Sequence, residues 1–187
     1  MIEISPLIHI TKELSGRWKI PIITQLEKSG GRFTPLLHKL QISPARLSEN
    51  LKALMDGHYI NSISANERTH PLFPEYYLTE KGKVLMEAAS VIMESEQNLN
   101  KGFLAAKKWT WPMLLALSQN YQQFNEIKKV LKVATPRIIS TRLSELEHIQ
   151  LVEKSWIQGE SIKPIYILEA NQSPIIHQAK EQLLKII

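Results

Sequence analysis

The sequence predicts a mostly α-helical protein with small β-hairpins, built from two tandem copies of one module. The first observation is that Trp18 recurs as Trp109, 91 residues later, together with the residues that follow it. The second is that apolar residues at helical spacing dominate both halves. The third is that each half also holds two short β-type runs around a polar loop. A repeat of this kind makes one duplicated domain the unit to be explained.

The matching positions keep their order along both copies. At an offset of 91 the further identities are Pro21 with Pro112, Leu26 with Leu117, Phe33 with Phe124 and Leu40 with Leu131. One inserted residue raises the offset to 92, at which the identities are Pro44 with Pro136, Ser48 with Ser140, Leu51 with Leu143 and Leu54 with Leu146. A two-residue deletion then lowers it to 90, where Pro74, Tyr76 and Leu78 match Pro164, Tyr166 and Leu168.

Capping residues and periodicity place the elements. Ser-Pro pairs at 5–6 and 43–44 are typical helix starts. In the first copy we expect helices at 5–15, 18–28, 33–40 and 44–56, strands at 59–64 and 76–78, and a long helix over 79–103. In the second copy we expect helices at 108–118, 124–131 and 136–149, strands at 151–157 and 165–168, and a closing helix at 173–187. This order is that of a winged helix-turn-helix. The expected domains are 1–100, which includes the linker helix, and 101–187.

Composition limits the classes of function. The 187 residues are 43% hydrophobic and 22% charged, typical of a globular protein. No apolar run reaches the roughly 18 residues of a membrane span, and no cationic signal segment opens the chain, so we expect a cytoplasmic protein without membrane contact. With no cysteine, scattered histidines and no phosphate-binding or nucleophile motif, we expect no metal, no cofactor and no enzyme activity.

Charge is distributed unevenly between the two copies. The net charge is +5, yet residues 1–100 hold 11 basic and 11 acidic residues. Residues 101–187 hold 12 basic and 7 acidic residues, so the whole excess lies in the second copy. A basic surface favours polyanionic partners.

Several segments resemble the HxlR-type family of bacterial winged-helix transcription regulators, which is related to the MarR group. GRWKIPII at 16–23 is similar to the family's G-K-W-T-L-P-I-L, and ISPARLSENLKAL at 42–54 is similar to I-S-P-R-V-L-S-E-R-L-K-E-L. RF at 32–33 and PEYYLTEKG at 74–82 match its R-F and its Y-x-L-T-x-x-G. The resemblance implies a winged helix-turn-helix that binds double-stranded DNA and dimerises through terminal helices.

The second copy departs further from the family pattern. It keeps KWTWP at 108–112 and TPRIISTRLSEL at 135–146, but LEAN at 168–171 replaces the closing L-T-x-x-G. Family members usually carry one domain in each chain, so two copies leave the oligomeric state open. A homodimer through the terminal or linker helices is possible, and any small-molecule effector is unknown.

A recognition helix needs an apolar face for its own domain and a polar face for the major groove. At 100° per residue, Leu47, Leu51 and Leu54 fall within about 60° of one another. The DNA-binding candidates of the first copy are therefore Ser43, Ala45, Arg46, Ser48, Glu49 and Lys52. Those of the second copy are Thr135, Arg137, Ser140, Thr141, Arg142 and Ser144.

The two helices differ where they would meet bases. Glu49, which repels phosphate but can accept from cytosine N4, corresponds to Thr141. Asn50 stands where the family has Arg, and Arg142 fills that place in the second copy. Arg137, near the helix start, can bind guanine in a bidentate manner. We therefore expect the second helix to bind DNA more strongly.

The expected wings add Arg68 and His70 in the first copy and Lys163 in the second, as contacts to the minor groove or flanking phosphates. Other interpretations stay open. The cap residues would begin any helix, Arg46 and Lys52 also suit a solvated surface, and wing loops are polar in any case. Trp18 and Trp109 are expected in the core.

The leading hypothesis is a sequence-specific DNA-binding transcription regulator. Its two winged helices would act as a pseudo-dimer on successive major grooves. The alternative is a tandem winged-helix scaffold for protein interaction with little or no DNA binding. The neutral first half and the altered closing motif of the second copy keep that alternative open.

Overall fold

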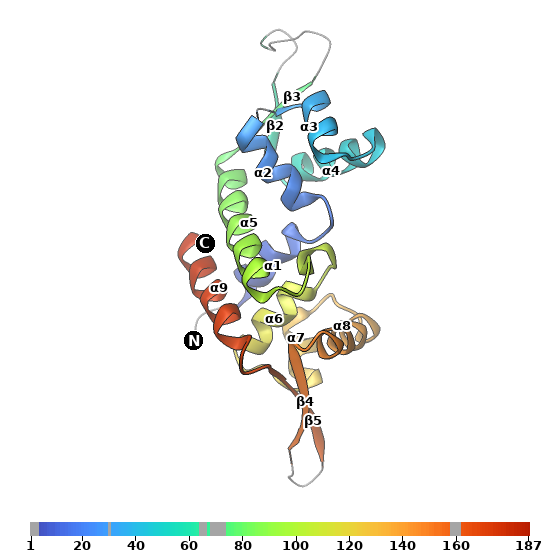
Figure 1. Cartoon of the computed structure of the whole chain (residues 1–187), viewed down its shortest axis with the longest axis vertical. Helices are drawn as coiled ribbons and strands as arrows, with labels where there is room; N and C mark the ends of the chain where they lie inside the picture. The colour runs from blue at the N-terminus through green and yellow to red at the C-terminus, as the bar shows by residue number, and fades with distance from the viewer. Residues whose placement is uncertain (1–3, 30, 64–66, 68–73, 158–161) are drawn as a thin grey trace. The chain divides into compact units, whose positions relative to one another are not determined.

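The computed structural model describes residues 4–29, 31–63, 67, 74–157 and 162–187. Contacts divide the chain into two compact units (Figure 1). We call residues 16–90 the N-terminal unit, and residues 1–15 together with 91–187 the C-terminal unit. Within the described residues, none of the helices has the length and apolar content needed to cross a membrane.

The N-terminal unit is a winged helix-turn-helix, as predicted. Its elements are α2 (Lys19–Ser29), β1 (Gly31–Arg32), α3 (Phe33–Leu40), α4 (Pro44–Asp56), β2 (Ile60–Ser62), β3 (Glu75–Leu78) and the first half of α5 (Glu80–Leu99). The strands form an antiparallel sheet in the order β1-β3-β2, with Ile60 opposite Leu78 and Gly31 opposite Tyr76.

The sequence did not predict strand β1. A Cβ atom on Gly31 would lie 1.6 Å from the carbonyl oxygen of Tyr76, so only glycine permits this close pairing. In the second copy the corresponding contact is a single bridge between Gln123 and Ile165. A two-residue strand has too little hydrophobic alternation to be recognised in a sequence.

The Leu-Thr-x-x-Gly segment joins the sheet to α5. The Thr79 hydroxyl donates to the carbonyl of His58 (2.7 Å) and accepts from the backbone N–H of Gly82 (3.0 Å). Gly82 is required because a Cβ there would lie 1.9 Å from the carbonyl oxygen of Tyr59. The second copy lacks this motif, yet the backbone N–H of Glu169 bonds to Leu151 at 3.0 Å, as Thr79 bonds to Tyr59. Both copies therefore keep this backbone hydrogen bond at the end of the sheet, although only the first copy has the Leu-Thr-x-x-Gly motif.

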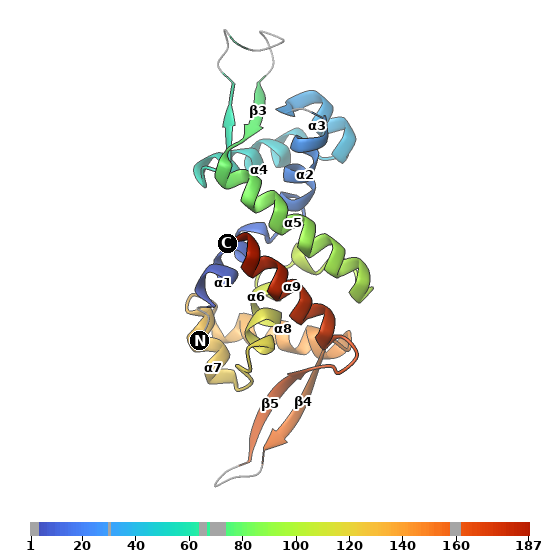
Figure 2. The same ribbon diagram turned by 90° about the vertical axis from the view of Figure 1, so that its left-hand side faces the viewer.

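The C-terminal unit repeats the same order of helices and strands (Figure 2). Besides the second half of α5, its elements are α1 (Ser5–Leu14), the 3-10 turn η1 (Leu104–Ala106), α6 (Thr110–Ser118), α7 (Phe124–Leu131), α8 (Pro136–His148), β4 (Val152–Ile157), β5 (Lys163–Leu168) and α9 (Ser173–Ile186). All nine residues of α6 are buried, and α1 and α9 both pack against it. Strands β4 and β5 form an antiparallel ribbon that extends from these helices.

Two details of the predicted helices are wrong. The linker helix ends at Leu99 rather than 103, because Asn100 and Gly102 adopt φ angles of 50° and 81°. Phe103, expected on its apolar stripe, is 40% exposed. Ser5 is the first residue of α1 and not its cap, which is Ile4.

A buried carboxylate fixes the segment that follows α5. One oxygen of Glu96 accepts from the backbone N–H of Ala105 (2.6 Å) and from the indole N–H of Trp111 (2.7 Å). Glu96 is 8% exposed, and burial raises its pKa above the ordinary value, although these hydrogen bonds oppose the shift. The carboxylate thus holds both η1 and α6 to the end of α5.

We expect Glu96→Gln to keep both hydrogen bonds through its amide oxygen and to change the dependence of stability on pH. A raised pKa in the folded state means that the stability of the natural protein falls as pH rises from the ordinary glutamate pKa through the raised value. The variant lacks this loss, so its free energy of unfolding relative to the natural protein should increase over that interval. Urea unfolding at a series of pH values measures it.

Glu96→Ala is the companion variant. It leaves two buried N–H donors without an acceptor and should lower the free energy of unfolding by about 2–4 kcal/mol. A pH-independent difference between Glu96→Gln and the natural protein would contradict the assigned raised pKa.

Candidate nucleic-acid interface

Each unit presents a helix-turn-helix, formed by α3 and α4 or by α7 and α8. Three residues, 41–43, connect α3 to α4, and four residues, 132–135, connect α7 to α8. The one-residue insertion that changes the repeat offset therefore lies in the second turn. In the first turn Gln41 takes the left-handed conformation (φ 49°, ψ 40°), whereas in the second turn Lys132 adopts φ 40° and ψ −63°.

One apolar stripe orients each recognition helix. Leu47, Leu51 and Leu54 of α4 are at most 1% exposed, as predicted from their spacing. Their counterparts on α8 are Ile139, Leu143 and Leu146, at most 2% exposed. Each helix begins at a side-chain cap, in which the Ser43 hydroxyl accepts from Arg46 N–H (3.4 Å) and the Thr135 hydroxyl from Ile138 N–H (3.3 Å).

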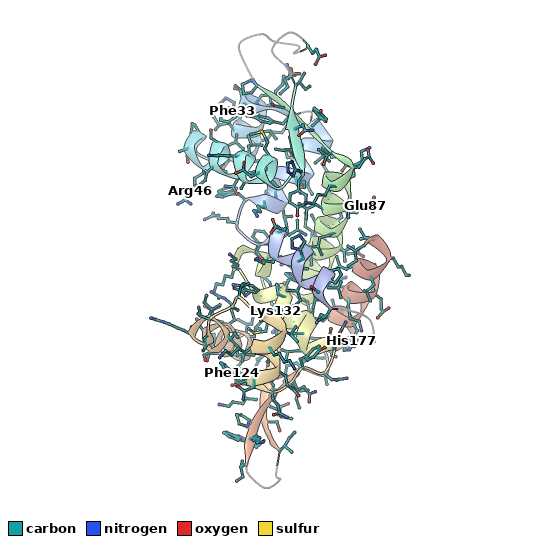
Figure 3. All side chains as sticks on the ribbon, turned by 180° about the vertical axis from the view of Figure 1, so that it is seen from behind. Phe33, Arg46, Glu87, Phe124, Lys132 and His177 are labelled. Carbon is teal, nitrogen blue, oxygen red and sulfur yellow. The ribbon has the colours of Figure 1, made fainter. Side chains whose placement is uncertain are left out.

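Burial of these stripes leaves the opposite faces open. Ten polar or small candidates on the two helices are exposed, in addition to Ala45: Ser43, Arg46, Ser48, Glu49, Lys52, Thr135, Arg137, Ser140, Thr141 and Ser144. Arg46 lies on the outer side of α4, as Figure 3 shows. Of the candidates on these helices, Arg142 alone is half-buried.

Arg142 is held by its own helix. Its Nη1 donates to the Glu145 carboxylate, which also binds the Lys107 ammonium at 3.1 Å. Burial lowers the pKa of the Arg142 guanidinium, and its Nε is buried without a partner among the described residues. Asn50, at the same place in the first copy, also turns back and donates to the Arg46 carbonyl (2.8 Å).

A groove of about 610 Å³ runs beside α4 and includes a cation that the sequence analysis missed. It is lined by Arg17 together with Trp18, Ser43, Arg46 and Glu49, among others. The Arg17 guanidinium lies 5.2 Å from the centre of the half-buried Trp18 ring. Lys108 lies 5.9 Å from the buried Trp109 ring in the second copy. The repeat itself, which places a basic residue before each tryptophan, was the signal for this pair.

The corresponding face of α8 borders a groove of about 520 Å³. Ser140, Thr141 and Ser144 line it together with Lys107 and His148. The Thr141 hydroxyl donates to the Arg137 carbonyl at 2.8 Å, so its oxygen keeps capacity to accept. Lys107, another missed cation, comes from η1's C-terminal boundary and was not apparent because no periodic pattern includes it.

The second wing carries more than the predicted Lys163. Lys163 begins β5, is exposed, and pairs with Ile157 across the ribbon. On β4, Lys154 lies 5.2 Å from the ring of Trp156, which is 58% exposed. The two-residue spacing of Lys154 and Trp156 indicates one strand face and could have revealed them. Arg68 and His70 of the first wing lie outside the described residues.

Comparison with known proteins agrees with this geometry. The family model described as HxlR-like helix-turn-helix matches residues 13–101 and again residues 104–180. The chain belongs to the HxlR-like helix-turn-helix family. It therefore carries this family's DNA-binding, winged helix-turn-helix domain twice, and it is a DNA-binding transcription regulator.

No curated protein sequence matches the chain. Among solved structures, diamide-treated YodB from B. subtilis is similar with 21% sequence identity and a TM-score of 0.38. The similarity covers 48% of this chain and 85% of that chain.

The described residues contain no cluster of three or more His, Cys, Asp or Glu side chains suited to a metal ion. The exposed faces of α4 and α8 carry hydrogen-bonding and cationic groups, and an α-helix fits into the major groove of DNA.

Arg142→Ala should destabilise the protein more than Arg137→Ala. The Arg142 guanidinium is half-buried and bound to Glu145, whereas Arg137 is exposed, so we expect a difference of about 1–2 kcal/mol in the free energy of unfolding. Urea denaturation of both variants measures it. Equal stabilities would show that the Arg142–Glu145 pair does not hold α8.

Proposed function

We propose that the chain binds a specific duplex DNA sequence through both recognition helices, with α8 contributing more than α4. The observation that carries this proposal is the exposed polar face of each helix opposite a fully buried apolar stripe. Such a face has donors and acceptors for base edges, and small side chains that permit close approach.

The ranking of the two helices rests on charge. Arg137 is exposed in the first turn of α8, and the wing adds Lys154 and Lys163. Lys107 in the adjoining groove is paired with Glu145. On α4, the exposed Arg46 shares its groove with Glu49, whose carboxylate repels phosphate. Arg142 would join DNA binding only through the part of its guanidinium that Glu145 leaves free.

The tandem arrangement supports the action of the copies as a covalent pseudo-dimer. Paired helix-turn-helix domains bind half-sites about 34 Å apart, or a multiple of it, along the duplex. Because α4 and α8 differ at their exposed positions, they would prefer different half-site sequences. We also propose that the first domain spans residues 1–100 and the second residues 101–187, and that two chains associate through their terminal or linker helices.

The protein should bind random-sequence duplex DNA with an affinity that falls steeply between about 50 and 200 mM salt, because each contact to a phosphate releases condensed counterions from the DNA. Arg137→Ala should weaken binding and reduce the slope of log K against log salt by about 0.9, whereas Arg46→Ala should do less. Fluorescence anisotropy titrations at several salt concentrations give both quantities.

Lys185→Ala is the matched control, since it removes one exposed positive charge from the end of α9, away from the recognition helix in the sequence. It should leave the slope unchanged. Binding that is absent or insensitive to salt would refute DNA binding and favour the scaffold hypothesis, and equal losses from Arg46→Ala and Arg137→Ala would refute the ranking.

Selection from a random DNA library should yield a site without twofold symmetry. The unequal helices predict two dissimilar half-sites with centres about 10 base pairs apart, or a multiple of that spacing. Sequencing of the bound fragments measures the symmetry. A perfect palindrome would contradict a pseudo-dimer and indicate that two chains bind through the same helix.

A further inference from the structure

A cavity of about 630 Å³ lies within the C-terminal unit, between α1 and the α7 segment. Its lining is apolar at Ile4, Ile8, Trp109, Val130 and Leu131. The volume falls in the range of small-molecule sites, and an apolar lining with a few polar groups is typical of them. None of these residues belongs to the exposed faces of α4 or α8.

Cations surround the apolar lining. Lys12, Lys129 and Lys132 all line the cavity, and Lys12 Nζ lies 5.7 Å from the centre of the Trp109 ring. None of the three lysines has an ion-pair partner among the residues that the structure describes. Glu126 is the acidic lining residue, and its carboxylate accepts from the backbone N–H groups of Gln122 (3.0 Å) and Gln123 (2.9 Å). Three lysines and one glutamate line the cavity, so the net charge of these lining residues is positive.

Two of the residues that line this cavity have unusual backbone conformations. Trp109 takes φ 75° and ψ −4°, a left-handed conformation that is rare for a bulky aromatic residue. Lys132 takes φ 40° and ψ −63°, also outside the ordinary regions for a side-chain-bearing residue. Strained residues of this kind gather at ligand sites and cost about 1–3 kcal/mol each.

The longer turn between α7 and α8 of the second copy forms part of the cavity lining. The cavity includes Lys132 and Val133 of the four-residue turn, where the first copy has three residues, and Val133 is 70% exposed. Figure 3 labels Lys132 in this turn. α1 supplies the opposite wall. The inserted turn and the N-terminal helix α1 therefore meet at one site.

We propose that this cavity binds a small apolar organic anion, whose carboxylate meets Lys12 and Lys129 while its hydrocarbon part packs on Ile8, Trp109 and Val130. Charge complementarity selects an anion over a neutral or cationic molecule. The apolar lining selects a hydrocarbon body over an inorganic ion. The site goes beyond DNA binding, and its test uses no DNA, so either proposal can fail while the other stands.

Isothermal titration calorimetry with 2-naphthoate, and with 2-naphthalenemethanol as the uncharged molecule of the same ring, tests the proposal. Naphthoate should bind with one site per chain, and the alcohol several-fold more weakly. Lys12→Gln combined with Lys129→Gln should weaken naphthoate binding about tenfold, as expected for two partly exposed charge pairs, and leave the alcohol unchanged.

Two further variants complete the design. Lys128→Gln alters an exposed lysine of the same helix that does not line the cavity, and it should bind naphthoate as the natural protein does. Val130→Trp should fill the cavity and abolish binding of both probes, with circular dichroism to establish that it folds. Absence of saturable naphthoate binding up to about 1 mM would overturn the site. Equal affinity for acid and alcohol, or an equal loss in Lys128→Gln, would overturn its anion preference.

Discussion

The rotation of each recognition helix about its own axis is fixed by the burial of one apolar stripe. On α4 this stripe is Leu47, Leu51 and Leu54, and on α8 it is Ile139, Leu143 and Leu146. Burial of such a side chain stabilises the fold by about 1.5–3 kcal/mol, so a rotation that exposed all three would cost several kcal/mol. This cost keeps the opposite, polar face outward in both copies. The DNA-binding candidates on α4 and α8 depend on it.

Duplication with divergence explains how the two units share a fold and differ in surface. Residues that pack, such as the apolar stripes, keep their character between the copies. Surface residues are free to change because most exposed substitutions alter stability little. Glu49 corresponds to Thr141, and a three-residue turn corresponds to a four-residue turn. The added turn residue also contributes to the lining of the cavity beside α1.

Several features were not predicted from the sequence. The pairing of β1 with β3 rests on the close approach of Gly31 to Tyr76. The early end of α5 follows from two positive φ angles, and the following turn is held by Glu96. Arg142 has the sequence position of a DNA contact, yet its guanidinium binds Glu145, three residues further along the same helix. The spacing of these two residues in the sequence was a signal for this pair.

The sequence by itself determined the duplicated winged helix-turn-helix, the helix starts at 43–44 and 135–136, and the exposed residues of both recognition helices. These follow from local rules, namely capping chemistry and the 3.6-residue period, which act over a few neighbouring residues. Only the tertiary structure decided that α1 packs on α6 and α9, that Arg17 joins the groove beside α4, and that a cationic cavity forms between α1 and α7. These features bring together side chains that are far apart in the sequence, and their positions depend on how whole helices pack.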